Sequence, residues 1–474
     1  MTTTNGNRKI IDLKRWEFCT PTPSTTAAGS SIISSRHHKQ QQLFIASATV
    51  HYLYNPSEDG WIQIPSGALA GTFGAGVCGT ATSVGPTGQC TNVGSSTTEI
   101  QTSLNLQRDL RGYKIYITAG PGAGQTATIT SNTIGANATI TVSTLSVAIE
   151  GTSFFKLLTP RFYVINAGTL AANIFKYYDY ALNTWTAVTQ TGLPATIGTD
   201  SKLIATPSFI GDDFVSFATG TATAATSTTL TNSSKTWTTN QWSNYQVRIT
   251  AGTGVGQVRT ISSNTGTALT VSTAWTITPS TDSVYSIEGN DDYLYYMGSN
   301  AVGLIRYSIS ANTWTTLSPG SARAAAPGAG MSGQWIYGVT DSLWSSESSI
   351  RNGRYIYSFR GGNGAILDRY DIALNTWTSS LAYAPATETF TTGTKYNYDG
   401  KNCLFIQKDA TGRWFKFNID EQSMDGWGTM LYTQGAAVVG DTCFDAIYED
   451  GATQIQYVYM LLNTSTVLLR QMVI

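Results

Sequence analysis

The sequence predicts an all-β protein with almost no helix, built from a repeated unit of short strands. Charged residues make up 12% and aromatic residues 11% of the 474 residues, and glycine contributes 46. This composition is typical of short strands joined by tight turns. A hairpin motif that recurs along the chain and a long segment that occurs twice are the other two observations. Together they predict one large repeat domain that carries two insertions.

The repeated hairpin pairs a tyrosine with a tryptophan seven positions later. It spans Tyr178 to Trp185 and recurs from Tyr307 to Trp314 and from Tyr370 to Trp377. Alternating aromatic and polar residues predict a strand, and the Asn-Thr that follows supplies residues for a turn. A fourth copy, Tyr54 to Trp61, keeps the spacing with a different turn. Because the turn varies while the aromatic pair stays, we expect the pair to pack between neighbouring sheets.

Six tryptophans occupy comparable positions, and four of them have the spaced tyrosine. Trp427 lacks it. The residues that we expect to anchor the repeats are Trp16, Trp61, Trp185, Trp314, Trp377 and Trp427, with Tyr54, Tyr178, Tyr307 and Tyr370.

An internal duplication explains two long gaps between these tryptophans. Residues 113–133 align without gaps to residues 245–265, and the similarity extends to both sides. We place the two copies at 79–158 and 220–288. Removing them reduces the two long tryptophan spacings to 44 and 60 residues, in line with the others. A period of about 40 to 50 residues is typical of β-propeller blades.

Each repeat accommodates four strands, and the two ends of the chain complement each other. The repeat after Trp427 is one strand short, and residues 10–18 can supply the missing strand. The sequence therefore predicts a six-bladed β-propeller closed by an N-terminal strand in the last blade, with two inserted homologous small β domains. Sharing a blade removes two exposed strand edges. The expected division is propeller at 1–78, 159–219 and 289–474, and inserted modules at 79–158 and 220–288.

Both modules enter between the first and second strands of consecutive blades, so we expect them on one face. Each contains a glycine-rich hairpin tip. A phosphate-binding loop needs a helix after its glycines, and none follows here, so the glycines are expected to permit positive φ. The tip residues that we expect to contact another protein are Gly122, Gly124, Gln125, Gly254, Gly256 and Gln257.

Charge and hydropathy bear on the partners. The formal net charge is -1, which gives no overall field to attract nucleic acid or an anionic membrane. Residues 1–15 lack the apolar segment of an export signal, and no run approaches the roughly 18 to 20 apolar residues that span a bilayer. Cys78 and Cys90 either bridge a local loop or stay free. The odd total of five cysteines and an expected reducing compartment favour free thiols.

No group of residues predicts an active site. The three histidines, His37, His38 and His51, all lie in the first blade, which disfavours a multi-histidine metal centre or a Ser-His-Asp triad. The acidic pairs lack regular calcium-ligand spacing. We therefore expect no enzyme and no catalytic, cofactor or metal residues. The open alternatives are calcium binding at Asp212–Asp213, Asp291–Asp292 or Glu449–Asp450, and binding of an acidic glycan or partner at Arg351, Arg354, Arg360 and Arg369.

Two resemblances bear on function. The Tyr-x6-Trp spacing with Asn-Thr-Trp, as in Tyr370 to Trp377, resembles kelch repeats, which build β-propellers. Of the usual diglycine, only Gly361-Gly362 is present. The duplicated segment, with residues 229–242 followed by 245–261, looks like a small β module that recurs in tailed-bacteriophage virion proteins. The second resemblance implies a particle component, since propellers occur in tail hubs, nozzles and neck rings.

We therefore expect a structural protein of a bacteriophage virion, a tail hub, nozzle or neck component assembled in the host cytoplasm. Its modules would dock neighbouring tail, neck or fibre proteins, and the chain would form a homo-oligomeric ring. A glycan-binding adhesin or receptor-binding virion protein is one alternative. A propeller glycoside hydrolase such as a sialidase is the other. A sialidase is expected to repeat Ser-x-Asp-x-Gly-x-Thr-Trp, and only residues 57–61 come near that pattern.

Overall fold

A computed structural model defines the fold. It describes residues 16–26, 29–35, 42–46, 51–65, 77–210, 213–299, 301–337, 353–362, 364–383, 388–408, 413–429, 439–444, 448–450, 453–462 and 465–473. None of these residues lies in a helix, and the strands β1 to β42 pair into antiparallel sheets. The predicted all-β class is therefore confirmed. Within the described part of the chain no helix could cross a membrane.

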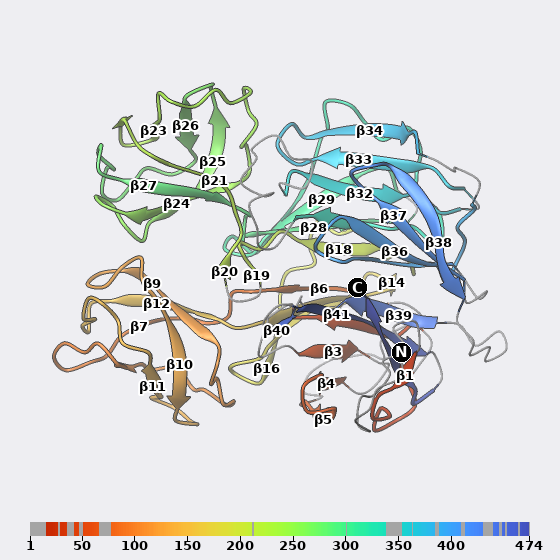
Figure 1. The fold of residues 1–474 in the computed structure, drawn as a ribbon, viewed down its shortest axis with the longest axis horizontal. Helices are drawn as coiled ribbons and strands as arrows, with labels where there is room; N and C mark the ends of the chain where they lie inside the picture. Colours follow the sequence, from red (N-terminus) through yellow and green to blue (C-terminus); the bar gives the residue numbers. More distant parts are fainter. Residues whose placement is uncertain are drawn as a thin grey trace, which may run out of the picture.

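Five sheets each consist of four strands paired in chain order (Figure 1). The first sheet contains β2 (Ser31–Ser34), β3 (Leu43–Ala46), β4 (His51–Asn55) and β5 (Gly60–Gln63). The second contains β6 (Val77–Thr82), β13 (Arg161–Asn166), β15 (Phe175–Asp179) and β16 (Thr184–Ala187). The third contains β18 (Lys202–Ala205), β28 (Tyr293–Met297), β29 (Leu304–Ser308) and β30 (Thr313–Thr316).

The fourth and fifth sheets follow without a long interruption. The fourth contains β31 (Gln334–Ile336), β32 (Tyr355–Phe359), β33 (Leu367–Asp371) and β34 (Thr376–Leu381). The fifth contains β35 (Lys395–Tyr398), β36 (Cys403–Lys408), β37 (Arg413–Asn418) and β38 (Ser423–Thr429). Two short ribbons lie outside the main sheets, β14 (Gly168–Thr169) with β17 (Thr196–Ile197) and β19 (Phe209–Ile210) with β20 (Asp213–Phe214).

The sixth sheet is assembled from both ends of the chain. It contains β39 (Val439–Phe444), β41 (Thr453–Leu462), β42 (Leu468–Val473) and β1 (Glu17–Phe18), with β40 (Tyr448–Asp450) paired to β41. In the β1–β42 pair, Glu17 lies opposite Arg470 and Phe18 opposite Leu469. The strand that the sequence predicts at residues 10–18 is therefore found at its last two residues, whereas residues 10–15 lie outside the described part of the chain.

The first strand of every sheet contacts the first strand of the next. The contacts run from β2 to β6, from β6 to β18, from β18 to β31, from β31 to β35, from β35 to β39, and from β39 back to β2. Most residues of four of these strands, β2, β18, β31 and β35, are buried, as expected for strands covered on both faces.

Two further sheets are inserted between the first and second strands of the second and third sheets. We call them the first and second inserts. The first insert has β7 (Thr87–Gln89), β8 (Glu99–Gln101), β9 (Lys114–Ala119), β10 (Thr126–Asn132), β11 (Thr139–Val142) and β12 (Phe154–Leu158). The second has β21 (Ser216–Thr221), β22 (Ala224–Ala225), β23 (Thr229–Thr231), β24 (Gln246–Ala251), β25 (Val258–Asn264), β26 (Ala268–Val271) and β27 (Val284–Glu288).

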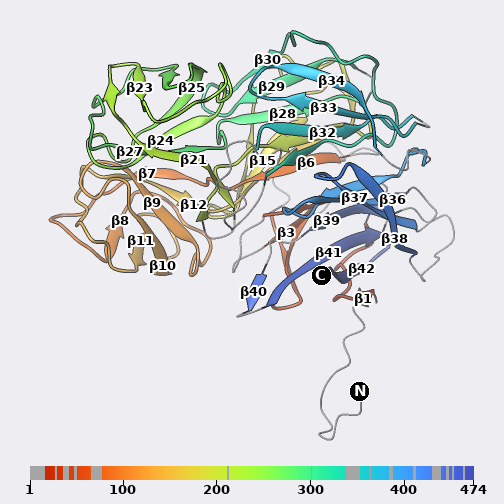
Figure 2. The same ribbon diagram turned by 45° about the horizontal axis from the view of Figure 1, so that its top comes forward.

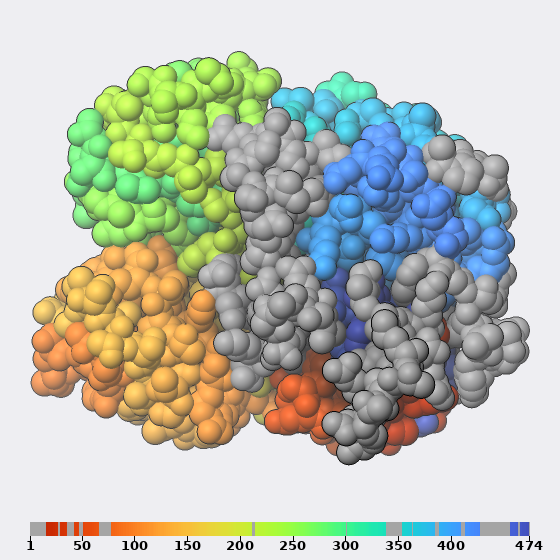
Figure 3. All heavy atoms as spheres, in the orientation of Figure 1, coloured from red at the N-terminus to blue at the C-terminus, as the bar shows by residue number. Residues whose placement is uncertain are grey.

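The two inserts share one fold. Their strand orders are β7-β12-β9-β10-β11-β8 and β21-β27-β24-β25-β26-β23, the second with β22 added at its edge. Their ladders shift register at aligned positions, between Ile129 and Ser131 and between Ile261 and Ser263. The boundaries of the inserts differ slightly from the expected 79–158 and 220–288. The first insert begins after β6, which continues to Thr82, and the second begins with β21 at Ser216. Figure 3 shows the inserts as two adjoining lobes beside the other sheets.

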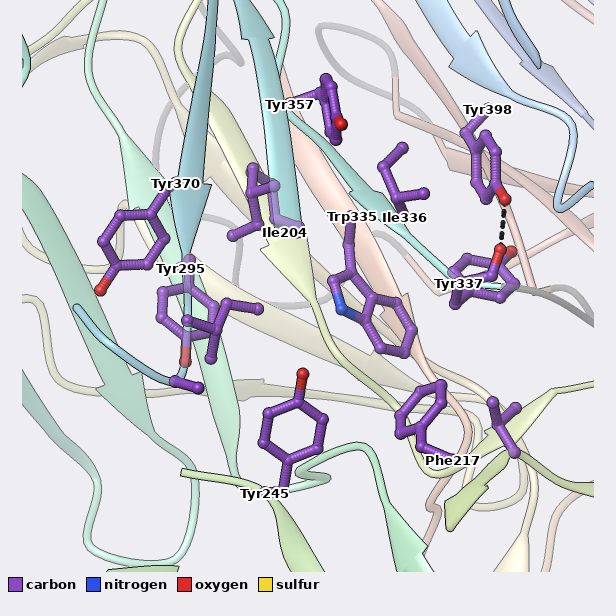
Figure 4. Close-up of a cluster of buried hydrophobic side chains, with 14 of the residues drawn as sticks. Ile204, Phe217, Tyr245, Tyr295, Trp335, Ile336, Tyr337, Tyr357, Tyr370 and Tyr398 are labelled. Atoms are coloured by element: carbon purple, nitrogen blue, oxygen red, sulfur yellow. Dashed lines mark hydrogen bonds between the residues drawn. The ribbon is translucent and has the colours of Figure 1, made fainter. Parts of the chain in front are cut away.

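The apolar cores of the inserts are continuous with those of the sheets. In the second insert, the Phe217 ring lies 5.8 Å from the Tyr245 ring and 6.3 Å from that of Trp335 in the fourth sheet (Figure 4). One core cluster joins this insert to the third, fourth and fifth sheets, and another joins the first insert to the first and second sheets. Since each insert shares a buried core with the sheets, packing as well as its linkers holds it in place. Figure 2 shows the two inserts next to each other, beside the other sheets.

Candidate interaction site at the paired inserts

The hairpin tip of the first insert is held by one glutamine. Gln125 Nε2 donates to the carbonyl oxygens of Gly122 and Val147, at 2.9 and 3.0 Å. Its Oε1 accepts from Ser146 Oγ and from the backbone N–H of Val147, at 2.8 and 2.9 Å. All the hydrogen-bonding capacity of the amide is therefore used within the insert. Gly122 has a φ of 78°, which is the reason for glycine at this turn.

The tip of the second insert repeats this arrangement. Gln257 Nε2 donates to the carbonyl oxygens of Gly254 and Ile277, at 3.1 and 2.8 Å. Its Oε1 accepts from the backbone N–H groups of Thr276 and Ile277, at 2.8 and 3.1 Å. The two glutamines thus fix the tips and the loops that follow β11 and β26. Their side chains are structural clamps in both inserts.

The two tips meet each other. A Cβ added at Gly256 would lie 2.8 Å from Ala123 Cβ and 2.9 Å from the Thr118 carbonyl oxygen. A Cβ added at Gly124 would collide with Val255 Cγ2. The expected interface residues Gly124 and Gly256 therefore do form an interface, but one that lies within the chain. Whether the tips also contact another protein stays a prediction.

Aligned residues face each other across this contact. Gly124 aligns with Gly256, and Ala123 aligns with Val255. Gly124 approaches Val255 and the Gly256 backbone, whereas Gly256 approaches Ala123 and the Gly124 backbone. Reciprocal contacts between equivalent residues define an isologous interface, the kind made by a twofold axis. The inserts are therefore related by a local twofold axis at their tips.

A buried ion pair lies beside the same contact. Arg248 Nη2 is 2.7 Å from Glu288 Oε2, and both side chains are at most 2% exposed. The guanidinium carbon lies 4.5 Å from the ring centre of Tyr116, which aligns with Arg248, and 4.0 Å from that of Phe214. Burial alone would lower the pKa of Arg248, but Glu288 outweighs it and the pKa is raised. Arg248 is therefore a buried cation that pairs with the Glu288 carboxylate and lies close to the rings of Tyr116 and Phe214.

A second ion pair ties the first insert to the third sheet. Lys156 Nζ lies 3.3 Å from Asp291 Oδ2, with both side chains nearly buried. Burial lowers the pKa of Lys156 although Asp291 acts in the opposite direction. Asp291 also accepts from the Ser208 backbone N–H at 2.6 Å. The Asp291 carboxylate therefore bonds groups within the chain, Lys156 and the Ser208 backbone.

Each insert is also anchored on a repeated hairpin. In the first insert, Arg108 Nη2 donates to Tyr178 Oη at 3.0 Å and to Asn183 Oδ1 at 2.9 Å. In the second, Asn244 Nδ2 donates to the Ile372 carbonyl oxygen at 3.2 Å. Asn244 Oδ1 also accepts from Arg306 Nη1 of the third sheet at 2.8 Å. The first insert thus contacts the hairpin of its own sheet, and the second contacts both its own sheet and the hairpin of the following one.

The tyrosines expected as anchors lie at the repeated turns and are buried. Tyr178 Oη donates to Asn183 Oδ1 at 2.7 Å, five residues on, and Asn183 has a φ of 50°. Burial raises the pKa of Tyr178 to about 12, so the phenol stays a donor. The same bond links Tyr307 to Asn312 and Tyr370 to Asn375, and Tyr54 donates likewise to Asp59.

The tryptophans expected as anchors lie directly opposite these tyrosines. The cross-strand pairs are Tyr54 with Trp61, Tyr178 with Trp185, Tyr307 with Trp314, and Tyr370 with Trp377. Three of the four indoles donate to carbonyl oxygens near the end of the preceding repeat, at Thr20, Pro65 and Thr189. The Trp377 indole makes no such bond, and Arg323 lies 4.8 Å from its ring.

The remaining two tryptophans differ from this pattern. Trp16 is partly buried and its ring lies 5.4 Å from that of Trp414. In the fifth sheet Phe417 pairs with Met424, so Met424 occupies the place that tryptophan holds elsewhere. Trp427 lies three residues further along β38, where the register shifts. Its side chain lies outside the described part of the chain.

The alternatives left open by the sequence have structural explanations where they are described. Asp292 accepts from Ser308 Oγ and the Ser310 backbone N–H, both at 2.6 Å. His51 is buried with its ring stacked on Phe44, and burial lowers its pKa to about 4. No group of three or more metal-ligating side chains occurs among the described residues. The side chains of His37, His38, Asp212, Asp213, Glu449 and Asp450 lie outside them.

The arginines that could have met an acidic partner are engaged within the chain. Arg354 pairs with Asp371 and Arg360 with Asp368, each at 2.7 Å, and Arg369 lies 4.3 Å from the Tyr355 ring centre. Arg351 lies outside the described residues.

Sequence analysis missed Tyr116, Arg248 and Glu288, which lie at the contact between the inserts, and Lys156, which ties the first insert to the third sheet. In the alignment of the two copies, Tyr116 stands at the position of Arg248. This difference between otherwise similar segments is the sequence feature that could have pointed to these residues. Cys78 and Cys90 are free buried thiols, in line with the alternative that the sequence favours.

The comparisons with known proteins identify no family. No family model matches the sequence, and no curated protein matches it. Among solved structures, the chain is similar to AofleA from Arthrobotrys oligospora, with a TM-score of 0.42 and 9% identity over 97% of this chain and 86% of that one. At this score the likeness supports neither a shared fold nor a shared function.

Proposed function

We propose that this chain is a non-enzymatic structural protein of a tailed-phage virion, a tail hub, nozzle or neck component. In this proposal its six sheets are the blades of a closed six-bladed β-propeller. Support for the ring comes from the contacts between first strands, which run from β2 through every sheet and return to β2. Support for closure by the N-terminal strand comes from the β1–β42 pair.

The observation that carries the proposed role is the pairing of the inserts. Here the tips interlock at Gly124 and Gly256, and Arg248 is buried between Tyr116 and Glu288. A rigid projecting pair is suited to holding neighbouring subunits at a fixed geometry, since preorganisation lowers the entropic cost of assembly.

The partners that this role implies are other tail, neck or fibre proteins and further copies of the chain in a ring. Nucleic acid is not among them, because a formal net charge of -1 provides no electrostatic attraction to phosphate. The propeller would set the position in the particle, and the insert pair would make the contacts.

Complementation tests the proposal. A phage that lacks this gene is grown on cells that supply the full chain, or a chain in which 216–288 is replaced by a short Gly/Ser linker. Mass spectrometry of purified particles should find the full chain and little of the shortened one. The cut follows β21 and β27, so the third sheet keeps its strands. If particles form normally without the chain and never contain it, the virion role is wrong.

A further inference from the structure

One arrangement of two tyrosines and an arginine occurs in the third, fourth and sixth sheets. In each, the arginine on the third strand lies directly opposite the second tyrosine of a Tyr-x-Tyr on the second strand. Its guanidinium carbon lies over the ring of the first tyrosine, at 4.0, 4.3 and 4.9 Å from the ring centre. The copies are Tyr293, Tyr295 and Arg306, then Tyr355, Tyr357 and Arg369, and then Tyr457, Tyr459 and Arg470. Stacking uses the flat face of a guanidinium and leaves N–H groups at its edge for an acceptor.

In the third and sixth sheets, a segment from elsewhere in the sequence supplies that acceptor. Arg306 Nη1 donates to Asn244 Oδ1 of the second insert at 2.8 Å. Arg470 Nε donates to Glu17 Oε2 of the N-terminal strand β1 at 3.3 Å. The arrangement therefore serves twice to bind a side-chain oxygen of a segment that is added to the sheet.

The copy in the fourth sheet has no such acceptor among the described residues. Arg369 lies over the Tyr355 ring but forms no ion pair with a described carboxylate, whereas Arg354 and Arg360 each form one. Thr378 stands opposite Arg369 on β34, at the place that Glu17 takes opposite Arg470. The Arg369 side chain is partly exposed and Thr378 is exposed, so a group from outside the chain can reach them.

A buried hydroxyl beside Arg369 also lacks a partner. Tyr357 is fully buried, and its Oη makes no hydrogen bond within the described part of the chain. Burial raises the pKa of Tyr357, and the positive charge of Arg369 acts in the opposite direction. Asp420, in the turn after β37, adds a weaker influence on Tyr357 without pairing with Arg369. The site thus contains donors and no acceptor, so the ligand that it fits is an acceptor.

We propose that Arg369, held on the Tyr355 ring, binds the carboxylate of an Asp or Glu side chain from a different virion protein. A carboxylate matches the guanidinium in charge and in the spacing of its two oxygens. A protein side chain is favoured over a sugar acid because Arg306 and Arg470 both bind side-chain oxygens. The carboxylate site stands on its own geometry, and only the naming of the partner as a virion protein rests on the proposed function.

Photo-cross-linking in purified phage particles tests the partner. The photoreactive residue p-benzoylphenylalanine replaces Thr378 in the full chain, which complements a phage lacking the gene. The matched control position is Thr315, which is also exposed and lies opposite Arg306. Mass spectrometry should find the Thr378 position joined to a segment of another virion protein that contains Asp or Glu, and the Thr315 position joined to no other protein.

Arginine variants connect the cross-link to the guanidinium. Arg369→Gln should lower the Thr378 cross-link about 10-fold or more, because the charge-assisted bonds are lost. Arg111→Gln removes an exposed arginine of the first insert and should leave the cross-link unchanged. Cross-links from Thr378 that stay within this chain, in the same copy or another, overturn the proposal. So does a cross-link that Arg369→Gln does not lower, or one to carbohydrate, which would make the ligand an acidic glycan.

A second measurement does not depend on particles. Nuclear magnetic resonance of the chain with isotope-labelled arginine follows the Nε–H signals, and the Arg369 signal is the one missing from Arg369→Gln. Replacing chloride with acetate up to about 100 mM, a range suited to weak single-group contacts, should shift this signal. The Arg306 signal should stay, because Asn244 already occupies its donor. An unshifted Arg369 signal overturns this inference even if particles contain the chain, whereas a shift in a chain that is absent from particles refutes only the virion role.

Discussion

The indole Nε1–H of Trp314 donates to the carbonyl oxygen of Thr189 at 2.9 Å, and Thr189 lies four residues after Trp185, the equivalent tryptophan of the preceding sheet. Trp185 makes the same bond to Pro65, four residues after Trp61, at 2.8 Å. Trp185 and Trp314 therefore each fasten their sheet to the edge of the one before it, whereas the Trp377 indole makes no such bond.

Phenylalanine substitution separates this hydrogen bond from packing. Trp314→Phe keeps most of the ring but leaves the Thr189 carbonyl without its donor, and should lower the free energy of unfolding by about 1 to 2 kcal/mol. Trp377→Phe should cost less, because the Trp377 indole is buried without a hydrogen-bond partner. Urea denaturation of both variants measures the difference. Equal losses would show that the indole bond contributes nothing.

Truncation tests the sheet shared by the two ends. Deleting residues 1–18 removes β1 and the contact of Trp16 with Trp414. Deleting 1–26 also removes backbone bonds from Cys19, Thr22 and Thr26 to the turn and strand at 465–468. The longer deletion should cost roughly 2 to 4 kcal/mol more, at about 1 kcal/mol per bond. Should both proteins melt at the wild-type temperature, the N-terminal segment does not stabilise the sixth sheet.

Alanine at the insert contact should loosen the pair. Gly124→Ala places a methyl against Val255 and also strains a φ of +88°. Gly94→Ala is the matched control, since its φ is +89° and nothing lies within 4 Å of the added Cβ. The control should cost about 1 to 2 kcal/mol from backbone strain, and Gly124→Ala about 1 to 3 kcal/mol more from overpacking. Denaturant titration compares them, and identical values would mean that the inserts do not touch at Gly124.

Neutralising Glu288 should strongly destabilise the insert pair. Glu288→Gln leaves the Arg248 guanidinium buried without its carboxylate, which is expected to cost about 3 to 5 kcal/mol. Asp109→Asn breaks the well-exposed pair with Arg111 and serves as the control, with almost no effect expected. Thermal unfolding reports both. A Glu288→Gln protein as stable as the Asp109→Asn protein would contradict the structural role assigned to the buried pair.

His51 should make stability depend on pH between about 6.5 and 4. Its pKa is lowered from 6.5 to about 4 in the folded protein, so the unfolded chain binds a proton first as the pH falls. The stabilisation is therefore present above pH 6.5 and is lost towards pH 4, by about 3 kcal/mol in all. His51→Phe should remove this part of the pH dependence. If the wild-type and variant curves run parallel over this window, His51 does not titrate as described.

Much of the fold could be predicted from local patterns. Strand alternation, the Tyr–Trp spacing and the turn residues at Asn183, Asn312 and Asn375 act over a few residues, so they specify the hairpins directly. The duplication was equally visible, because aligned residues such as Gly122 and Gly254 keep the same task in both copies. Such patterns fail in the fifth sheet, where Met424 pairs with Phe417 in the place expected for tryptophan, and Trp427 lies further along β38, at the register shift.

The meeting of the two inserts was decided only by the tertiary structure. Two like modules entered at equivalent places of neighbouring repeats would by themselves point the same way. The β19–β20 ribbon precedes β21, and the second insert bonds to the Ile372 hairpin of the following sheet. The contact of Gly124 with Gly256 joins residues far apart in sequence. This contact depends on how the whole chain folds, and patterns of neighbouring residues do not predict that.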